Sequence, residues 1–348
     1  MDSIIECVPN ISEGRDIAKI ERIVDAARNI VGCAVLGVEP DQDYNRTVIT
    51  IAGEPQSVQQ AAHELILKAI EEIDMTTHSG EHPRLGAVDV CPFVPLKGVT
   101  MDECVELARS LAERVASSAQ VPVFVYGEAA FNKEKTLLST IRKGEYEGLE
   151  ERLTKGASSH PESTRYPDFG PSEWNSSTAR SGGVTIGARE ILVAYNVNVM
   201  EKDARVSKKI GSLVRSSGRL VKHQDGRKMR IPGMLSMVQG MGVTLEAHSM
   251  SQVSMNLRDV NQCPMHVAFE TCKSIASDHG VDVIGSELVG LVPLQAMLVA
   301  GQWYASEGEN DEFRLVAAAI DGLGLRQIDD FVPEQRIIEW AVKKAVSQ

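Results

Sequence analysis

The chain has 348 residues, 43% of them hydrophobic, and a net charge of −12. This length favours two domains over one, the negative charge argues against nucleic acid as the main partner, and no apolar stretch approaches the roughly 20 residues that span a bilayer. The acidic start of the sequence lacks the basic region of a secretory signal, so we expect a cytoplasmic protein.

The first half of the chain alternates strand and helix patterns. Periodicity and turn residues predict a strand at 4–8, a helix at 16–30, strands at 34–38 and 46–52, a helix at 57–73 and a strand at 87–96. This β-α-β-β-α-β order is that of the split βαβ, or ferredoxin-like, unit. A helix at 102–117 capped by Thr100, a strand at 121–126 and a helix at 133–142 extend the unit. Residues 155–183, rich in Ser, Pro, Gly and Thr, predict a long irregular loop.

The second half repeats the order. The predicted elements are a strand at 191–199, a helix at 203–216, strands at 235–241 and 253–257, a helix at 264–279 and a strand at 281–284. A helix at 334–346 follows, with Pro333 in its first turn. We therefore predict an α+β fold of two ferredoxin-like subdomains, 1–189 and 190–348, with a ligand cleft or tunnel between them. The terminal helix is assigned to the second subdomain.

A basic strip interrupts this acidic chain. Between Arg205 and Arg230, nine Lys and Arg residues stand against one acid, Asp225, so the strip carries +8 and the remainder −20. Such a strip attracts anions. The alternative interpretation is a solvated helix followed by a flexible basic loop.

The strongest candidate for chemistry is His82. It lies between Glu81 and the Pro83-Arg84 pair, just before an apolar strand. Pro83 pushes the backbone of His82 toward extended geometry, and Gly80 lets a ligand or another backbone approach closely. An imidazole titrates near neutrality, which makes His82 a candidate proton carrier. The alternative is a loop histidine that only makes a structural hydrogen bond.

The sequence does not predict a metal site. His78 and His82 have the spacing of two ligands on a helix, but Gly80 and Pro83 disfavour a helix there. The six cysteines contain no C-x-x-C pair, so neither a zinc ribbon nor a redox motif is indicated.

The segment around His82 resembles the active-site stretch of the glutamate formiminotransferases, also called formimidoyltransferases. Further segments resemble the same family in the same order, at 6–14, 45–48, 126–130, 168–172, 187–189, 194–198, 252–257 and 285–293. Together they cover nearly the whole chain.

The resemblance implies transfer of the formimino group from N-formimino-L-glutamate to tetrahydrofolate, in histidine catabolism and one-carbon metabolism. Tetrahydrofolate would be the co-substrate, without a metal, and the family suggests a homodimer. His82 matches the catalytic histidine of the family and would move a proton between the two nitrogens. The chain is too short to include the cyclodeaminase domain of some relatives, so we expect transfer without cyclisation.

The resemblance also implies an acid near His82. Glu39 stands where the family's pattern places an aspartate, and it would pair with His82 or with the cationic amidine of the substrate. Because Glu39 is one methylene longer, Glu81 remains an alternative partner.

The remaining substrate-binding candidates are polar side chains and loop residues. Arg46, Arg84 and Arg189 either bind the carboxylates of glutamate or folate or form structural ion pairs. Asn10 and Asn196 either bind substrate or cap a turn. The other candidates are Asn45, Gly80, Gly170, Pro171, Ser172, Gly182, Gly183 and Gly187, whose glycines would let backbone amides approach the pterin.

Two other functions remain open. One is a glutamate formyltransferase that uses 5-formyltetrahydrofolate or N-formylglutamate, and the other is a folate-binding scaffold without catalysis. If the folate carries several glutamates, the basic strip with Lys208 and Lys209 is expected to attract its tail.

Overall fold

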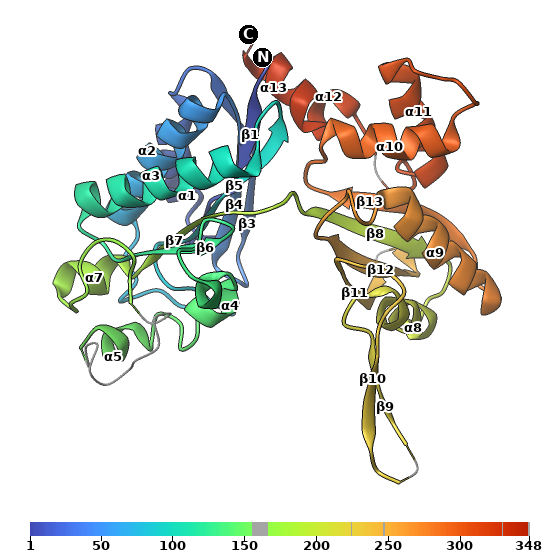
Figure 1. Cartoon of the computed structure of the whole chain (residues 1–348), viewed down its shortest axis with the longest axis horizontal. Coiled ribbons are helices and arrows are strands. Elements are labelled where there is room, and N and C mark those ends of the chain that lie inside the picture. The colour runs from blue at the N-terminus through green and yellow to red at the C-terminus, as the bar shows by residue number, and fades with distance from the viewer. Residues whose placement is uncertain (155–165, 224, 246–247, 329, 347–348) are drawn as a thin grey trace. The chain divides into compact units, whose positions relative to one another are not determined.

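A computed structural model describes residues 1–154, 166–223, 225–245, 248–328 and 330–346. The chain forms two compact units, Met1–Glu190 with the chain's end from Val342, and Ile191–Ala341 (Figure 1). Each unit combines helices with a β-sheet, which confirms the α+β class. The second boundary falls within helix α13 (Ile338–Val346), which the sequence analysis had assigned wholly to the second subdomain. No helix in the described residues is long and apolar enough to cross a membrane.

The first unit contains a seven-stranded sheet. Its strands are β1 (Ile4–Cys7), β2 (Asn10–Ile11), β3 (Cys33–Asp41), β4 (Arg46–Gly53), β5 (Val88–Lys97), β6 (Val123–Gly127) and β7 (Val184–Ala188). The spatial order is β3-β4-β1/β2-β5-β7-β6. The first four positions are antiparallel, whereas β7 runs parallel to β5 and β6.

Three long helices, α1 (Ile17–Arg28), α2 (Pro55–Glu72) and α3 (Met101–Ala119), pack beside one another against this sheet (Figure 1). The side chain of Asp16 caps α1, and Thr100 forms a capping box with Glu103 at the start of α3. The predicted Thr100 cap is thus confirmed, and such a cap contributes typically about 1 kcal/mol.

Strand β4 shows how the sheet separates core from site. Ile49 and Ile51 are fully buried in the apolar core formed with the helices. Arg46, Val48 and Thr50 alternate with them and are half-buried on the opposite face. Polar side chains therefore gather on the face away from α1, α2 and α3.

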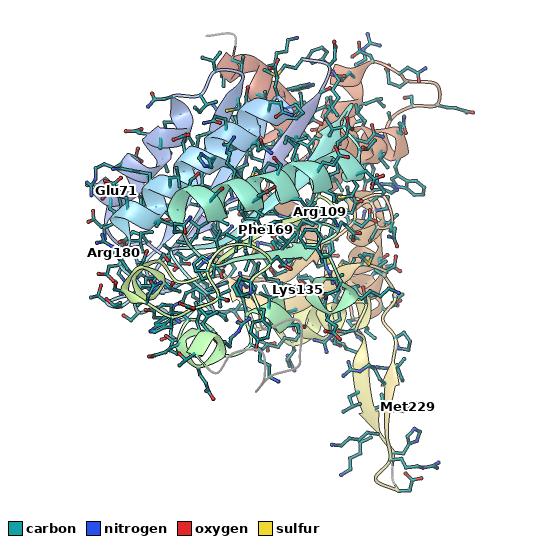
Figure 2. All side chains as sticks on the ribbon, turned by 60° about the vertical axis from the view of Figure 1, so that its left-hand side comes forward. Glu71, Arg109, Lys135, Phe169, Arg180 and Met229 are labelled. Atoms are coloured by element: carbon teal, nitrogen blue, oxygen red, sulfur yellow. The ribbon has the colours of Figure 1, made fainter. Side chains whose placement is uncertain are left out.

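The segment between β6 and β7 departs from the prediction. A 3₁₀ turn, η1 (Lys133–Lys135), and a short helix, α4 (Leu138–Ile141), replace the single helix predicted at 133–142, because Leu137 is extended. Lys135 donates to Asp168 at 2.7 Å, and Figure 2 labels Lys135 and Phe169, the residue that follows Asp168 in the chain. Helix α5 (Leu149–Thr154) follows.

The predicted loop at 155–183 is wrong over part of its length. Residues 155–165 lie outside the described residues, but Ser176–Ser181 form helix α7. The side chain of Asn175 accepts hydrogen bonds from the first amides of α7, a strong start signal that outweighs the weak helix propensity of Ser and Thr.

The second unit contains a four-stranded antiparallel sheet of order β11-β12-β8-β13. Its elements are β8 (Val193–Val199), α8 (Arg205–Val214), β11 (Val238–Leu245), β12 (Met250–Leu257), α9 (Met265–Asp278) and β13 (Val283–Val289). Two helices that were not predicted follow, α10 (Leu294–Tyr304) and α11 (Glu312–Leu323). The helix predicted at 334–346 is divided, and its first part is α12 (Pro333–Arg336). Pro333 occupies the first turn of α12, as predicted, but Ile337 is extended and separates α12 from α13.

The basic strip continues from α8 into a two-stranded hairpin. Strands β9 (Arg219–Lys222) and β10 (Lys228–Ile231) are antiparallel and project from the four-stranded sheet (Figure 1), with Met229 labelled on the hairpin in Figure 2. The alternative of a flexible loop is therefore wrong for the described residues. The Asp225-Gly226 pair, with Gly226 at φ +86°, is the turn signal that could have predicted the hairpin.

Candidate functional site

His82 lies in the loop between α2 and β5 and is half-buried. Its Nδ1 is 2.6 Å from the carbonyl oxygen of Pro83, and its Nε2 contacts Nη1 of Arg46. A carbonyl only accepts and a guanidinium only donates, so the neutral imidazole with its proton on Nδ1 satisfies both contacts. The ring of Tyr44 packs edge-on at 5.8 Å between centroids.

The surroundings of His82 keep its ring uncharged. Burial, followed by the positive charge of Arg46, lowers the pKa of His82 to about 4. At neutral pH the imidazole is therefore uncharged, with a proton on Nδ1 only, so its Nε2 can accept a proton.

Arg46 connects His82 to the sheet. It begins β4, and its Nη2 donates to the side-chain oxygen of Asn10 on β2. Asn10 is 4% exposed and donates in turn to the carbonyl of Val8 at 2.8 Å. None of the described residues accepts a hydrogen bond from the buried Nε of Arg46. The structure thus brings two of the predicted residues, Asn10 and Arg46, to His82.

A buried ion pair beside this group was not predicted as part of the site. Asp89, at 1% exposed, accepts from Nε of Arg142 at 3.0 Å and from the amide of Leu85 at 3.1 Å. Asp89 and Arg142 both act electrostatically on Arg46, and Arg142 also acts on His82. The available signal was a lone acid inside an apolar run, because such an acid is almost never buried unpaired.

In the described part of the chain, the acids expected near His82 form no hydrogen bond with it. Glu39 on β3 and Glu81 are both exposed, and within the described chain neither side chain is hydrogen-bonded to His82. Glu39 does share the sheet face of Arg46, because Glu39 and Asn10 are both paired with Val48.

Asn45 and Gly80 hold the loop that carries His82. Asn45 adopts φ +49°, accepts from the amide of Gly14 at 2.9 Å and donates to the carbonyl of Ser79 at 2.9 Å. A Cβ on Gly80 would lie 2.3 Å from the carbonyl oxygen of Tyr44. Both residues therefore make contacts that position the loop.

Arg84 forms a structural ion pair, which was one of its two predicted roles. Its side chain is 9% exposed, and its two terminal nitrogens reach the carboxylate of Glu147 at 2.9 and 2.6 Å. Its Nε donates to His78 at 3.2 Å. Burial lowers the pKa of His78, so this ring is the neutral acceptor that Arg84 requires.

Gly182 and Gly183 join α7 to the strand entrance after His82. Their amides donate to the carbonyls of Thr178 at 2.8 Å and Leu85 at 3.0 Å. A Cβ on Gly182, which has φ +64°, would lie 2.5 Å from Cα of Gly86. These two amides are bonded within the fold, and the expected role of the glycines in letting backbone amides approach the pterin stays a prediction.

The other candidates lie on several elements. Gly170, at φ +82°, sits against the carbonyl of Val121, and Gly187 on β7 sits against Tyr126. Arg189 is half-buried and donates to the carbonyl of Glu190 at 2.9 Å. Pro171 is half-buried and Ser172 exposed, and Asn196 lies on β8 in the second unit.

The described residues contain no cluster of three or more His, Cys, Asp and Glu side chains that could hold a metal ion. The centre of the candidate site is a neutral imidazole, a guanidinium and an amide, from His82, Arg46 and Asn10. This group can exchange a proton and can bind a carboxylate.

Comparison with known families identifies the class of protein. Residues 4–189 match the N-terminal subdomain of the formiminotransferase domain, and residues 194–343 match the formiminotransferase domain. The chain belongs to the formiminotransferase family.

Individual relatives differ in length. Formimidoyltransferase-cyclodeaminase of Dictyostelium discoideum is 41% identical over 99% of this chain and 61% of its own length. Glutamate formimidoyltransferase of Streptococcus pyogenes serotype M1 is 39% identical over 87% of this chain and 94% of its own. Glutamate formimidoyltransferase of Thermoplasma acidophilum is 38% identical over 89% of this chain and 95% of its own length. The chain thus spans about three fifths of the first relative and nearly all of the other two.

Proposed function

We propose that this protein transfers the formimino group of N-formimino-L-glutamate to tetrahydrofolate, giving 5-formiminotetrahydrofolate and L-glutamate. Two relatives that match over nearly their whole length carry the name glutamate formimidoyltransferase. The observation that carries the proposal is the uncharged imidazole of His82 in contact with Arg46, which in turn donates to Asn10.

The chemistry requires one proton to be removed and one to be supplied. N5 of the folate attacks the amidine carbon, a C–N5 bond forms and N5 loses a proton. The bond between that carbon and the glutamate nitrogen then breaks, and this nitrogen takes up a proton. Nε2 of His82 accepts the first proton and donates it to the leaving nitrogen, so the enzyme ends as it began. Such proton transfer typically contributes about 10²–10⁴-fold.

Arg46 links substrate binding to the basicity of His82. In this structure Nη1 of Arg46 donates to Nε2 of His82, so this hydrogen bond must break before Nε2 can take a proton. A substrate carboxylate would draw the guanidinium into a bidentate pair and neutralise its charge. The pKa of His82 then rises toward its ordinary value, because the second cause of its depression is offset.

Strand order supports an assignment of both units to the ferredoxin-like type. In a βαββαβ unit of this type, the first strand lies between the third and the fourth. In the first unit these are β1/β2, β4 and β5, in the order β3-β4-β1/β2-β5, and in the second unit they are β8, β12 and β13, in the order β11-β12-β8-β13. We assign the protein to histidine catabolism and one-carbon metabolism, as a cytoplasmic homodimer, by analogy with the family.

The decisive experiment combines purified protein with N-formimino-L-glutamate and tetrahydrofolate, followed by acid conversion of the product to methenyltetrahydrofolate and optical detection. We expect turnover in the wild type and a loss of about 10²–10⁴-fold in His82→Ala, with folate binding retained. His279→Ala is the matched control, because His279 is exposed at the end of α9.

Parallel reactions with N-formyl-L-glutamate, or with 5-formyltetrahydrofolate and L-glutamate, distinguish a formyltransferase. Turnover only with the formyl donors would replace the formimino assignment. Near-normal turnover of His82→Ala would refute the role of His82.

A further inference from the structure

One face of the second sheet is lined by amide and carboxyl side chains. On β8, Asn196 and Asn198 alternate with Tyr195 and Val197, which are fully buried. The groups that act electrostatically on Tyr195 are Glu270 and Cys272 on α9 and Tyr304 on α10. Tyr195 therefore faces those helices, and the asparagines lie on the opposite face. The strand register places Gln252 of β12 directly beside Asn198.

Three side chains on this face form one hydrogen-bonded cluster. Nε2 of Gln252 donates to Oδ1 of Asn198 at 2.9 Å and to Oε2 of Glu287, on β13, at 3.0 Å. Asn198 is fully buried, Gln252 is 3% exposed, and Glu287 is half-buried. We call these three residues the amide cluster.

The carboxylate fixes the orientation of the whole amide cluster. Because a carboxylate only accepts hydrogen bonds, Gln252 must present its NH₂ group to Glu287. The same NH₂ group meets Asn198, so Asn198 must present its oxygen there and point its own NH₂ group away.

The NH₂ group of Asn198 has no acceptor among the residues that the structure describes. Its Nδ2 is buried, and no described residue accepts a hydrogen bond from it. Leaving such a donor unpaired costs about 1–3 kcal/mol, and native proteins rarely do so. The amide cluster therefore provides a free donor at Asn198 beside a carboxylate with accepting capacity at Glu287.

We propose that the amide cluster binds the pyrimidine edge of a reduced pterin, an inference that rests on the proposed function. A 2-amino-4-oxo-pyrimidine edge carries two adjacent N–H donors, the 2-amino group and N3, followed by the acceptor O4. The carboxylate of Glu287 accepts the two donors, and Nδ2 of Asn198 donates to O4. Gln252 holds both side chains in place.

A formimino group also presents two N–H donors in one plane and could reach the same carboxylate. The formimino group itself offers no acceptor beside these donors, and the nearest acceptors of N-formimino-L-glutamate are its carboxylates on a flexible chain. The pterin edge holds two donors and one acceptor in a rigid row, which matches the carboxylate of Glu287 and the unpaired Nδ2 of Asn198 more fully.

The test measures equilibrium binding of 5-formyltetrahydrofolate and of its 2-desamino-2-methyl analogue, without turnover. We expect Glu287→Gln to weaken 5-formyltetrahydrofolate about 10–100-fold, as for loss of a charge-assisted hydrogen bond. The analogue lacks the 2-amino donor, so it should bind the wild type at least about 10-fold more weakly and lose little further affinity in Glu287→Gln. Asn198→Ala should also weaken 5-formyltetrahydrofolate, whereas Asn256→Ala, a half-buried amide on β12, serves as the control.

Equal wild-type affinity for the two folates overturns the inference, and this comparison needs no variant. Unchanged folate affinity in Glu287→Gln overturns it as well. If Glu287→Gln binds folate normally but N-formimino-L-glutamate competes with folate less well than in the wild type, the amide cluster binds the other substrate and the inference is overturned. A wild type that binds folate in this pattern but transfers nothing would refute the proposed function alone.

Discussion

Replacing Arg46 with methionine tests how the site controls the protonation of His82. The change removes the charge that contacts Nε2 of His82 and keeps most of the apolar stem. Without the neighbouring cation the protonated imidazole is less disfavoured, so the pKa of His82 should rise.

The size of the shift can be bounded. The pKa of His82 falls from 6.5 to about 4, with burial as the largest cause and Arg46 as the second. Two unit charges about 4 Å apart interact by about 1 kcal/mol in water and about 4 kcal/mol at an effective dielectric constant of 20. At 1.36 kcal/mol per pKa unit, the lower figure corresponds to about 0.7. Solvent reaches this half-buried ring, so we expect a rise of roughly one.

Proton NMR can follow the ring of His82 through a pH titration. The protein has eight histidines, and His82→Asn identifies the signal by its loss. We expect an inflection near pH 4 in the wild type, a rise of roughly one pH unit in Arg46→Met, and little change in Arg46→Lys, which keeps the charge. A wild-type inflection near 6.5, or no rise in Arg46→Met, would contradict this account.

The same depression predicts how stability depends on pH. Because the pKa of His82 is lower in the folded chain than in the unfolded chain, its contribution is fully present above about pH 6.5 and is lost as the pH falls toward 4. Urea unfolding of the wild type and of His82→Asn, measured at several pH values across this range, gives the contribution. If the free energy of unfolding depends on pH with the same slope in both proteins, the contribution of His82 is refuted.

Three further substitutions test the fold and the basic strip. Lys135→Met should lower the free energy of unfolding by about 3–5 kcal/mol, because it leaves Asp168 buried without its cation. In urea unfolding, the double variant Lys135→Met with Asp168→Asn should recover most of this loss. No recovery would exclude the ion pair as the cause. Gly182→Ala should cost about 1–3 kcal/mol in the same assay, because Gly182 has a backbone conformation open almost only to glycine; an unchanged midpoint would count against that. Glutamate at both Lys208 and Lys209 should weaken polyglutamylated folate more than the monoglutamate in equilibrium binding, and equal effects would exclude the basic strip as the tail site.

Regular elements with one buried face could be predicted from the sequence. The helix predicted at 57–73 is α2 (Pro55–Glu72), because its apolar residues repeat with the helical period and Pro55 marks its start. Strand β7 (Val184–Ala188) could not be predicted in the same way. All five of its residues are buried, so no alternation marks it, and its pairing with β5 and β6 involves partners far away in the sequence.

The sequence identified His82, Arg46 and Asn10 as separate candidates but could not predict their contacts. Arg46 is 36 residues from both His82 and Asn10, and the register of β2 and β4 brings it to them. Asp89 and Arg142 were missed for the same reason, since their pairing spans 53 residues. The resemblance implied Glu39 as the acid partner of His82, with the neighbouring Glu81 as the alternative, whereas the side chain that contacts Nε2 of His82 is the guanidinium of Arg46 on β4.

The hydrogen bonds of each candidate separate positioning residues from residues with capacity for a ligand. Asn45, Gly182 and Gly183 use their polar groups within the fold, so substrates cannot pair with those groups unless the fold changes. Nε of Arg46 and Nδ2 of Asn198 remain unpaired among the described residues, and each lies on the face of its sheet that is turned away from the main helices. Both are donors, and the proposed substrates offer acceptors, as carboxylates and as O4 of the pterin. The unpaired donors therefore favour ligands rich in acceptors.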